Sequence, residues 1–150
     1  MGRDPAGSRG VKKTILVLCV GNSCRSQIAA GWLRHLGGDR VEIVGGGAKP
    51  AKGVAARAIT VMDEVGIDIR DNTPTLYTER LGLPLDHAIA VCSVEECSYP
   101  ALPESIPFHR LPVTDPGHHE GTEEEILQAH REVRDELKLK METFLKEIFA

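Results

Sequence analysis

The residues with the clearest chemical potential lie at positions 19–26, where the sequence is C-V-G-N-S-C-R-S. An apolar run precedes this segment and a helical pattern follows it. Backbone N–H groups of such a loop, and of the first helical turn, can converge on a tetrahedral oxyanion. Arg25 adds a planar guanidinium that binds two oxygens at once. The predicted oxyanion-binding residues are Val20, Gly21, Asn22, Ser23, Cys24, Arg25 and Ser26.

Cys19 is the predicted nucleophile of this loop. The N–H groups and Arg25 that attract an oxyanion also stabilise a thiolate, and Ser26 is placed to donate a hydrogen bond to it. Asn22 tolerates left-handed backbone geometry and can brace the loop with its amide. The alternative, an inert buried cysteine, does not explain the loop and the arginine together. Cys24 is better explained as a spectator than as an oxidation partner of Cys19.

An acidic residue, Asp115, follows a predicted strand and precedes Pro116. Ligands of parallel α/β sheets bind at the carboxyl ends of the strands, so Asp115 and the Cys19 loop should share one edge. Asp115 is therefore a candidate general acid that protonates a departing oxygen. A purely structural Asp-Pro-Gly turn explains the same residues equally well.

Two further cysteines, Cys92 and Cys97, come at or just after the end of another predicted strand. If the segment between them is helical, their Cα atoms rise about 7.5 Å apart along its axis. A disulfide needs roughly 4.4–6.8 Å, so pairing them would require the helix to unwind. Two unrelated thiols remain possible, whereas a zinc site has little support because no second cysteine pair follows. His118 and His119 are better explained as a solvated loop than as ligands.

The elements that position these residues alternate between strand and helix patterns, which predicts an α/β fold with a mainly parallel sheet. Prolines near both ends of the fourth strand place it at a sheet edge. Thr122 and Glu125 form a predicted capping box for the last helix. The predicted strands are 13–20, 41–44, 86–92 and 107–113, the predicted helices are 26–36, 54–65, 93–97 and 122–149, and Gly45–Gly47 is predicted to be flexible.

Length and composition predict one domain. The 150 residues suffice for a single core, spanning 12–150, and residues 1–11 are polar and Gly-rich, which predicts a disordered tail. The net charge of −4 disfavours nucleic acid as a partner. No apolar run is long enough for a membrane span and no signal peptide is evident. We expect a cytoplasmic monomer whose cysteines are catalytic, redox-active or inert.

The string C-V-G-N-S-C-R-S-Q resembles the low-molecular-weight tyrosine phosphatase superfamily, and within it the thioredoxin-coupled arsenate reductases. Ser23-Cys24, Gln27, Gly31-Trp32, the G-I-D-I at 66–69 and Asp115-Pro116 are similar in place, and so are later segments at 121–125 and 133–136. The resemblance covers nearly the whole chain after residue 11. It implies a three-layer α/β sandwich built on a four-stranded parallel sheet.

The resemblance also implies a mechanism. Cys19 attacks arsenate while Asp115 protonates the leaving hydroxyl, and Cys92 then displaces arsenite by forming a disulfide with Cys19. Cys97 resolves that disulfide, and thioredoxin reduces the resulting Cys92–Cys97 pair. Phosphate and sulfate are expected as competing oxyanions. In this chain the two redox cysteines are closer together than is typical of the family.

No tightly bound cofactor or metal is implied, with one qualification. Members of the family often bind potassium near the loop through an acidic residue and a serine. At those positions this chain has Ala30 and the Gly45–Gly47 run, although Asn22 and Asp68 remain. We therefore expect the potassium site to be weak or absent, so that activity should not rise steeply when potassium replaces sodium.

Two other functions use the same residues. A protein tyrosine phosphatase would need Cys19, Arg25 and Asp115 but neither Cys92 nor Cys97. It would also need aromatic residues at the entrance of its site to bind the phosphotyrosine ring. Aromatic residues make up only 4% of the chain, and Tyr77 and Tyr99 are the nearest candidates for this role. A non-enzymatic redox or anion sensor has no specific residue in its favour.

Overall fold

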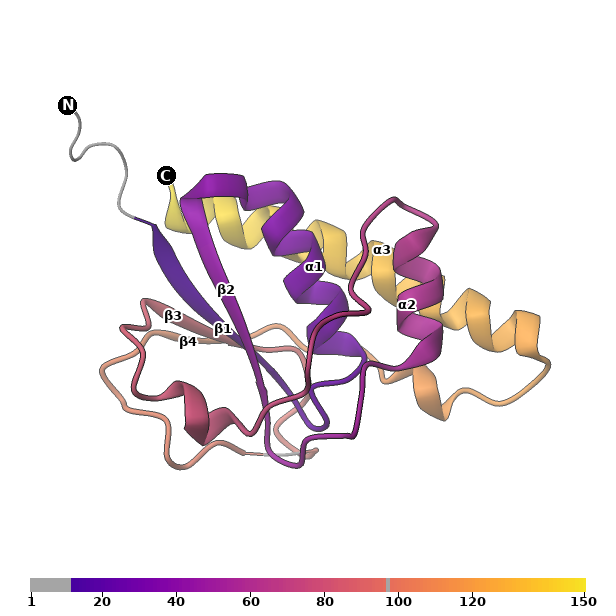
Figure 1. The fold of residues 1–150 in the computed structure, drawn as a ribbon, viewed down its shortest axis with the longest axis horizontal. Coiled ribbons are helices and arrows are strands. Elements are labelled where there is room, and N and C mark those ends of the chain that lie inside the picture. The colour runs from indigo at the N-terminus through magenta and orange to yellow at the C-terminus, as the bar shows by residue number, and fades with distance from the viewer. Residues whose placement is uncertain (1–11, 97) are drawn as a thin grey trace.

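The computed structural model describes residues 12–96 and 98–150, so the predicted tail and Cys97 lie outside the described residues. Its strands pair in parallel in the order β2-β1-β3-β4 (Figure 1). The predicted parallel sheet is confirmed, and so is the edge position of the fourth strand. The strands are β1 (Lys13–Cys19), β2 (Val41–Gly47), β3 (His87–Ala90) and β4 (Phe108–Arg110).

Three α-helices gather on one side of this sheet (Figure 1). α1 packs on β1 and β2 and against α3, while α2 packs on α3. The other side is covered by irregular segments and the 3₁₀ helix η2, which lies against β2. The three-layer arrangement is thus present, with the third layer mostly non-helical. The helices are α1 (Arg25–Gly37), α2 (Ala56–Asp63) and α3 (Glu123–Ile148), and the 3₁₀ helices are η1 (Gly38–Arg40), η2 (Tyr77–Arg80) and η3 (Pro116–His118).

The central strand β1 forms the middle of the core. Residues 15–18 have no exposed surface, which is expected of a parallel strand covered on both faces. Helix α1 ends as predicted, with Gly38 at a positive φ of 55° that glycine adopts easily. Helix α3 begins with the predicted capping box between Thr122 and Glu125.

Several predicted boundaries are wrong. β2 includes Gly45–Gly47, which were expected to be flexible, because the Gly47 N–H donates to Thr75 and Arg80 donates to the Gly45 carbonyl. The predicted helix at 93–97 is absent from its described part, where Glu96 N–H donates to the Ser93 carbonyl in a turn. Four residues are too few to offset the cost of nucleating a helix there. β3, β4 and α2 are shorter than predicted.

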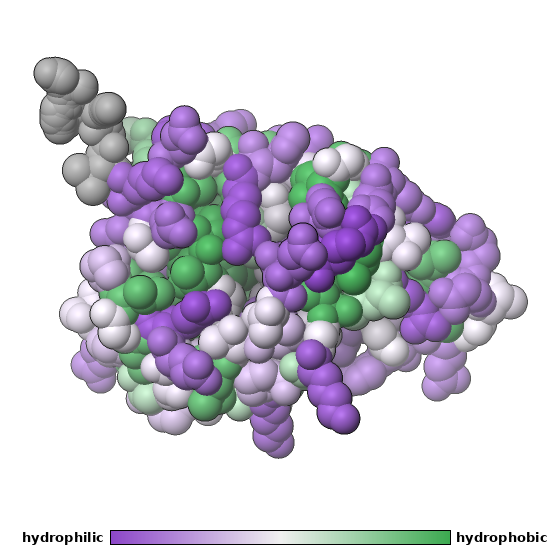
Figure 2. Space-filling view, in the orientation of Figure 1, coloured by the Kyte–Doolittle hydropathy of each residue, from purple (hydrophilic) through white to green (hydrophobic). Residues whose placement is uncertain are grey.

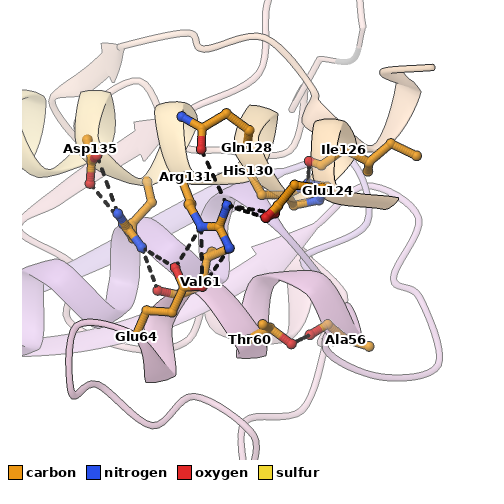
Figure 3. A network of polar contacts seen from close by, with 11 residues as sticks. Ala56, Thr60, Val61, Glu64, Glu124, Ile126, Gln128, His130, Arg131 and Asp135 are labelled. Atoms are coloured by element: carbon orange, nitrogen blue, oxygen red, sulfur yellow. Dashed lines mark hydrogen bonds and ion pairs between the residues drawn. The ribbon is translucent and has the colours of Figure 1, made fainter. Parts of the chain in front are cut away.

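A polar network joins α2 to α3 (Figure 3). Glu64, just after α2, accepts hydrogen bonds from Arg131 at 2.9 and 3.0 Å and from Arg134 at 2.9 Å. Arg134 also donates to the Val61 carbonyl at 3.0 Å. Since Trp32 of α1 donates to the Arg134 carbonyl, the network ties all three helices together.

Hydrophilic side chains are spread over the face displayed in Figure 1, with apolar residues between them (Figure 2). Within the part of the chain that the structure describes, no helix combines the length and apolar character that crossing a membrane requires.

Candidate active site

The oxyanion loop connects the end of β1 to the start of α1. Cys19 is the last residue of the strand and Arg25 the first of the helix. Between them, Asn22 adopts left-handed geometry with φ 51°, which asparagine tolerates better than most residues. The predicted strand–loop–helix arrangement is therefore present.

The carbonyl groups of this loop face a neighbouring segment. Those of Val20, Gly21 and Ser23 accept hydrogen bonds from the N–H groups of Lys49, Ala51 and Ala55, each at 2.9 Å. Among the described residues, none of the turn and loop hydrogen bonds uses an N–H of residues 20–25 as donor. Loop N–H groups without a partner in these turns could converge on a bound anion.

Cys19 is braced from inside the loop. Its Sγ lies 3.1 Å from Ser26 Oγ, and Asn22 Nδ2 donates to the same hydroxyl oxygen at 2.8 Å. The Ser26 oxygen thus accepts from Asn22, which leaves its own proton free to point at a Cys19 thiolate. The other end of the Asn22 amide accepts from Thr75 N–H at 3.0 Å. Ser26 thus lies next to Cys19 and Asn22 braces the loop, while donation from Ser26 to a Cys19 thiolate stays a prediction.

Glycine in β2 allows the loop to lie this close to the sheet. A Cβ on Gly47 would meet the Val20 carbonyl oxygen at 2.8 Å and the Asn22 nitrogen at 3.0 Å. A Cβ on Gly45 would meet Asn22 Nδ2 at 2.7 Å. Gln27 adds a brace that the sequence did not reveal, donating to the Asn22 carbonyl at 2.9 Å. The position of the loop therefore depends on β2 as well as on its own residues.

Arg25 is buried, with only 4% of its side chain exposed, and its guanidinium already holds an anion. Nη2 and Nη1 donate to the two carboxylate oxygens of Glu96 at 2.7 and 3.0 Å, and Nη1 also donates to the Val113 carbonyl. The hydrogen bond from Arg25 lowers the pKa of Glu96 to about 2, against an opposing effect of burial. The bidentate grip predicted for an oxyanion is thus made with a carboxylate.

Glu96 is a residue that the sequence analysis missed. It sits in an acidic pair just before Cys97, in a segment that was predicted to be helical. The clue was its position after the third strand, since that places it at the same sheet edge as Arg25.

Asp115 makes the turn contact that the sequence suggested and also lies beside Arg25. One carboxylate oxygen accepts from the Gly117 N–H at 2.9 Å, as in a turn. The other lies 3.9 Å from Arg25 Nη2 and 3.6 Å from Nε2 of the exposed His118. Asp115 therefore stands beside the arginine of the oxyanion loop, within a turn that fixes its orientation.

Cys24 lies in the same loop but in a different electrostatic environment. Burial raises the pKa of its thiol to about 12, and the neighbouring charges of Cys19 and Asp115 act in the same direction. A thiol with this pKa is neutral at physiological pH and is a poor nucleophile. This environment supports the spectator role predicted for Cys24.

Cys92 follows β3, which pairs with β1, so Cys19 and Cys92 lie at the same edge of the sheet. Cys92 is fully buried, and its Sγ lies 3.3 Å from Tyr99 Oη. The Tyr99 ring packs edge-on against Tyr77 of η2. Cys19 instead contacts Ser26 of α1, so the two thiols face different layers. A bond between them would require movement of the segment after β3.

A cavity of about 560 Å³ opens beside Arg25. Its walls include Glu96, Asp115 and His118, and none of its lining residues is Phe, Tyr or Trp. Tyr77 and Tyr99, the aromatic candidates for gripping a phosphotyrosine ring, are buried on the η2 side of the sheet.

The described residues contain no group of three or more His, Cys, Asp or Glu side chains suited to a metal ion. Asp68, one of the residues considered for potassium, forms an ion pair with Arg70 at 3.0 Å. The Asn22 carbonyl oxygen is likewise occupied by Gln27.

Comparison with known proteins places this geometry in a family. The family model for low molecular weight phosphotyrosine protein phosphatases matches residues 14–150. A protein of Staphylococcus epidermidis named arsenate reductase 2 is 38% identical over 133 residues, which are 89% of this chain and 96% of that protein.

Two solved structures show the same fold. One, described as an arsenate reductase in the phosphate binding state, is 29% identical with a TM-score of 0.76, and the match covers 91% of this chain and 98% of that one. The low molecular weight protein tyrosine phosphatase from T. tengcongensis is 21% identical with a TM-score of 0.73, over 91% and 99% of the two chains. At that identity the phosphatase supports the fold alone.

Proposed function

Because the chain belongs to the low molecular weight phosphotyrosine protein phosphatase family, we propose that it reduces arsenate to arsenite with Cys19 as nucleophile. The observation that carries the proposal is the joint placement of Cys19, Arg25 and Asp115 around one anion loop, with Cys92 at the same edge of the sheet. The relatives named arsenate reductase support it, since they match this chain over nearly their whole length.

The first step forms a bond between Cys19 sulfur and arsenic(V). The loop N–H groups and Arg25 hold the oxygens of arsenate, and Asp115 gives its proton to the departing hydroxyl, which leaves as water. The Ser26 hydroxyl stabilises the thiolate before attack, since its oxygen already accepts from Asn22. Arsenic remains at oxidation state V in this adduct.

The second step is the reduction. The Cys92 thiolate attacks Cys19 sulfur, the sulfur–arsenic bond breaks, and arsenite departs with the electron pair. Cys97 then attacks Cys92 sulfur and releases the Cys19 thiolate. The dithiol of thioredoxin reduces the Cys92–Cys97 disulfide, so each arsenate consumes two electrons from that partner. The chain carries out this cycle as a cytoplasmic monomer.

The phosphatase alternative is less well supported. Binding a phosphotyrosine ring requires aromatic or apolar residues at the entrance of the site. The cavity beside Asp115 is lined by polar residues, a proline and a valine. Tyr77 and Tyr99 are buried elsewhere. The relay also gives a role to Cys92 and Cys97, which phosphate transfer does not need.

The test is arsenate-dependent NADPH consumption with thioredoxin and thioredoxin reductase. Cys92→Ser is expected to accumulate the Cys19 adduct without releasing arsenite, and Cys97→Ser to stop after one arsenite per chain. Cys19→Ser should release none. Normal cycling by both Cys92→Ser and Cys97→Ser would contradict the relay and would favour the phosphatase.

A further inference from the structure

Arg25 and Glu96 form a bidentate ion pair in which the Arg25 side chain is buried. A guanidinium on a side chain that is only 4% exposed would be costly to leave without a counter-ion, because burial removes the water that solvates its charge. The Glu96 carboxylate supplies that counter-ion in the ligand-free protein. Its two oxygens accept from Arg25 Nη1 and Nη2. Two oxygens of a phosphate-like anion would accept from the same two nitrogens.

We propose that Glu96 is an internal competitor for the oxyanion site, so that a tetrahedral oxyanion binds by displacing the Glu96 carboxylate from Arg25. The inference deepens the function proposed above and rests on it, since it concerns how the substrate of that same site gains access to Arg25. It assigns Glu96 a positioning role rather than a chemical one.

The geometry around the pair supports displacement rather than permanent pairing. Arg25 keeps a second partner, the Val113 carbonyl at 3.0 Å, which can hold the guanidinium in place when Glu96 leaves. Glu96 is 31% exposed and lines the cavity beside Asp115, so its carboxylate has solvent to move into. Arg25 is therefore the fixed member of the pair and Glu96 the movable one.

Displacement has a consequence for the segment after β3. Glu96 also accepts a hydrogen bond from the Ser93 N–H at 2.8 Å, and Arg25 is what attaches this turn to the oxyanion loop. When an oxyanion takes the place of the carboxylate, the turn that follows Cys92 loses that attachment. Binding of the anion is thereby coupled to release of the segment that must move for Cys92 to approach Cys19.

Glu96 also sets a charge requirement for the ligand. A doubly charged oxyanion can outcompete one carboxylate for the buried guanidinium, whereas a singly charged anion gains little from the exchange. Competition from Glu96 thus lowers the affinity of the Arg25 site for every anion, and it lowers the affinity for singly charged anions most.

The test uses inorganic phosphate as the probe, with affinity measured by isothermal titration calorimetry on the full chain. Glu96→Gln removes the competing charge and keeps the size of the side chain. If the pair is closed in roughly nine of ten ligand-free molecules, the dissociation constant should fall about tenfold. The matched control is Glu95→Gln, an adjacent exposed glutamate, which should bind phosphate within about twofold of wild type.

A second readout follows the turn itself. In wild type, phosphate should shift the amide resonance of Ser93, because that N–H donates to the carboxylate that moves. In Glu96→Gln the shift should be largely lost. If Glu96→Gln proves unstable, Glu96→Asp keeps the charge but is too short to reach Arg25 in the same geometry, and it should also bind phosphate more tightly.

Unchanged or weaker phosphate binding in both Glu96 variants would overturn the inference, because Glu96 would then be a structural support of Arg25. None of these measurements requires arsenate reduction. The reductase proposal can therefore fail while the competition stands, and the competition can fail while the enzyme still reduces arsenate.

Discussion

At the scale of single residues, Cys19 depends on a short chain of hydrogen bonds. Asn22 donates to Ser26, Ser26 faces Cys19, and Thr75 holds the far end of the Asn22 amide. Ser26 has no exposed surface and Asn22 only 1%, so these hydrogen bonds are shielded from competing water. The reactivity of the sulfur is therefore expected to follow the Ser26 hydroxyl.

We predict that Ser26→Ala slows alkylation of Cys19 by iodoacetamide at pH 7 at least about tenfold, since a hydrogen bond to a charged group contributes roughly 1.5–3 kcal/mol. The measurement is the rate of label appearing on the Cys19 peptide by mass spectrometry. Thr60→Ala, which removes an exposed hydroxyl on α2, should leave the rate unchanged. An equal rate in Ser26→Ala would show that the hydroxyl does not stabilise the thiolate.

At the scale of elements, β2 supports the oxyanion loop although it contributes no candidate reactive group. Its glycines let the oxyanion loop approach the sheet, and the contact at Gly47 involves loop backbone rather than a flexible side chain. The run at 45–47 is therefore ordered strand with a steric function. Composition alone suggested flexibility, because three consecutive glycines also occur where no partner fixes the chain.

We predict that Gly47→Ala destabilises the protein by about 1–3 kcal/mol, as overpacking of a tight contact does, and strongly weakens phosphate binding. Urea unfolding and calorimetric titration measure the two effects. The control is Gly53→Ala, where an added Cβ meets nothing within 4 Å. Wild-type phosphate affinity in Gly47→Ala would show that the loop can adjust without losing its N–H geometry.

At the scale of the whole molecule, the network around Glu64 joins the three helices that cover one face of the sheet. Hydrogen bonds from Arg131 lower the pKa of Glu64, although partial desolvation opposes them. A carboxylate whose pKa is lower in the folded state contributes stability above its unfolded pKa. That contribution is lost as the pH falls through the folded value.

We predict that Glu64→Gln lowers the free energy of unfolding at pH 7 by up to about 1 kcal/mol, because Glu64 is about a third exposed and its ion pairs are screened. The difference from wild type should shrink as the pH is lowered below the ordinary range of glutamate. Denaturant unfolding from pH 7 to pH 3 measures it, with Glu132→Gln, an exposed glutamate of α3, as control. A difference that stays constant with pH would indicate lost packing instead of lost charge.

Much of the fold followed from local pattern. The continuous apolar run of β1, the helical spacing and terminal glycines of α1, and the capping box of α3 are properties of adjacent residues, so they were predictable. Short elements were predicted less well. β4 has only three residues, and the segment at 93–96 is too short to form a stable helix. Tertiary contacts therefore decided the conformation of both segments.

The sequence by itself predicted the strand–loop–helix arrangement of the oxyanion loop, because the strand, the turn and the first helical residues are contiguous. It also determined that Asp115 and Cys92 end at one sheet edge, since parallel strands share their direction. Tertiary structure alone decided which partner each group meets. Arg25 pairs with Glu96 across 71 positions of sequence, Cys92 turns toward Tyr99 rather than Cys19, and Gly47 receives the loop. Contacts at such separations depend on how the layers stack, and no local spacing encodes that.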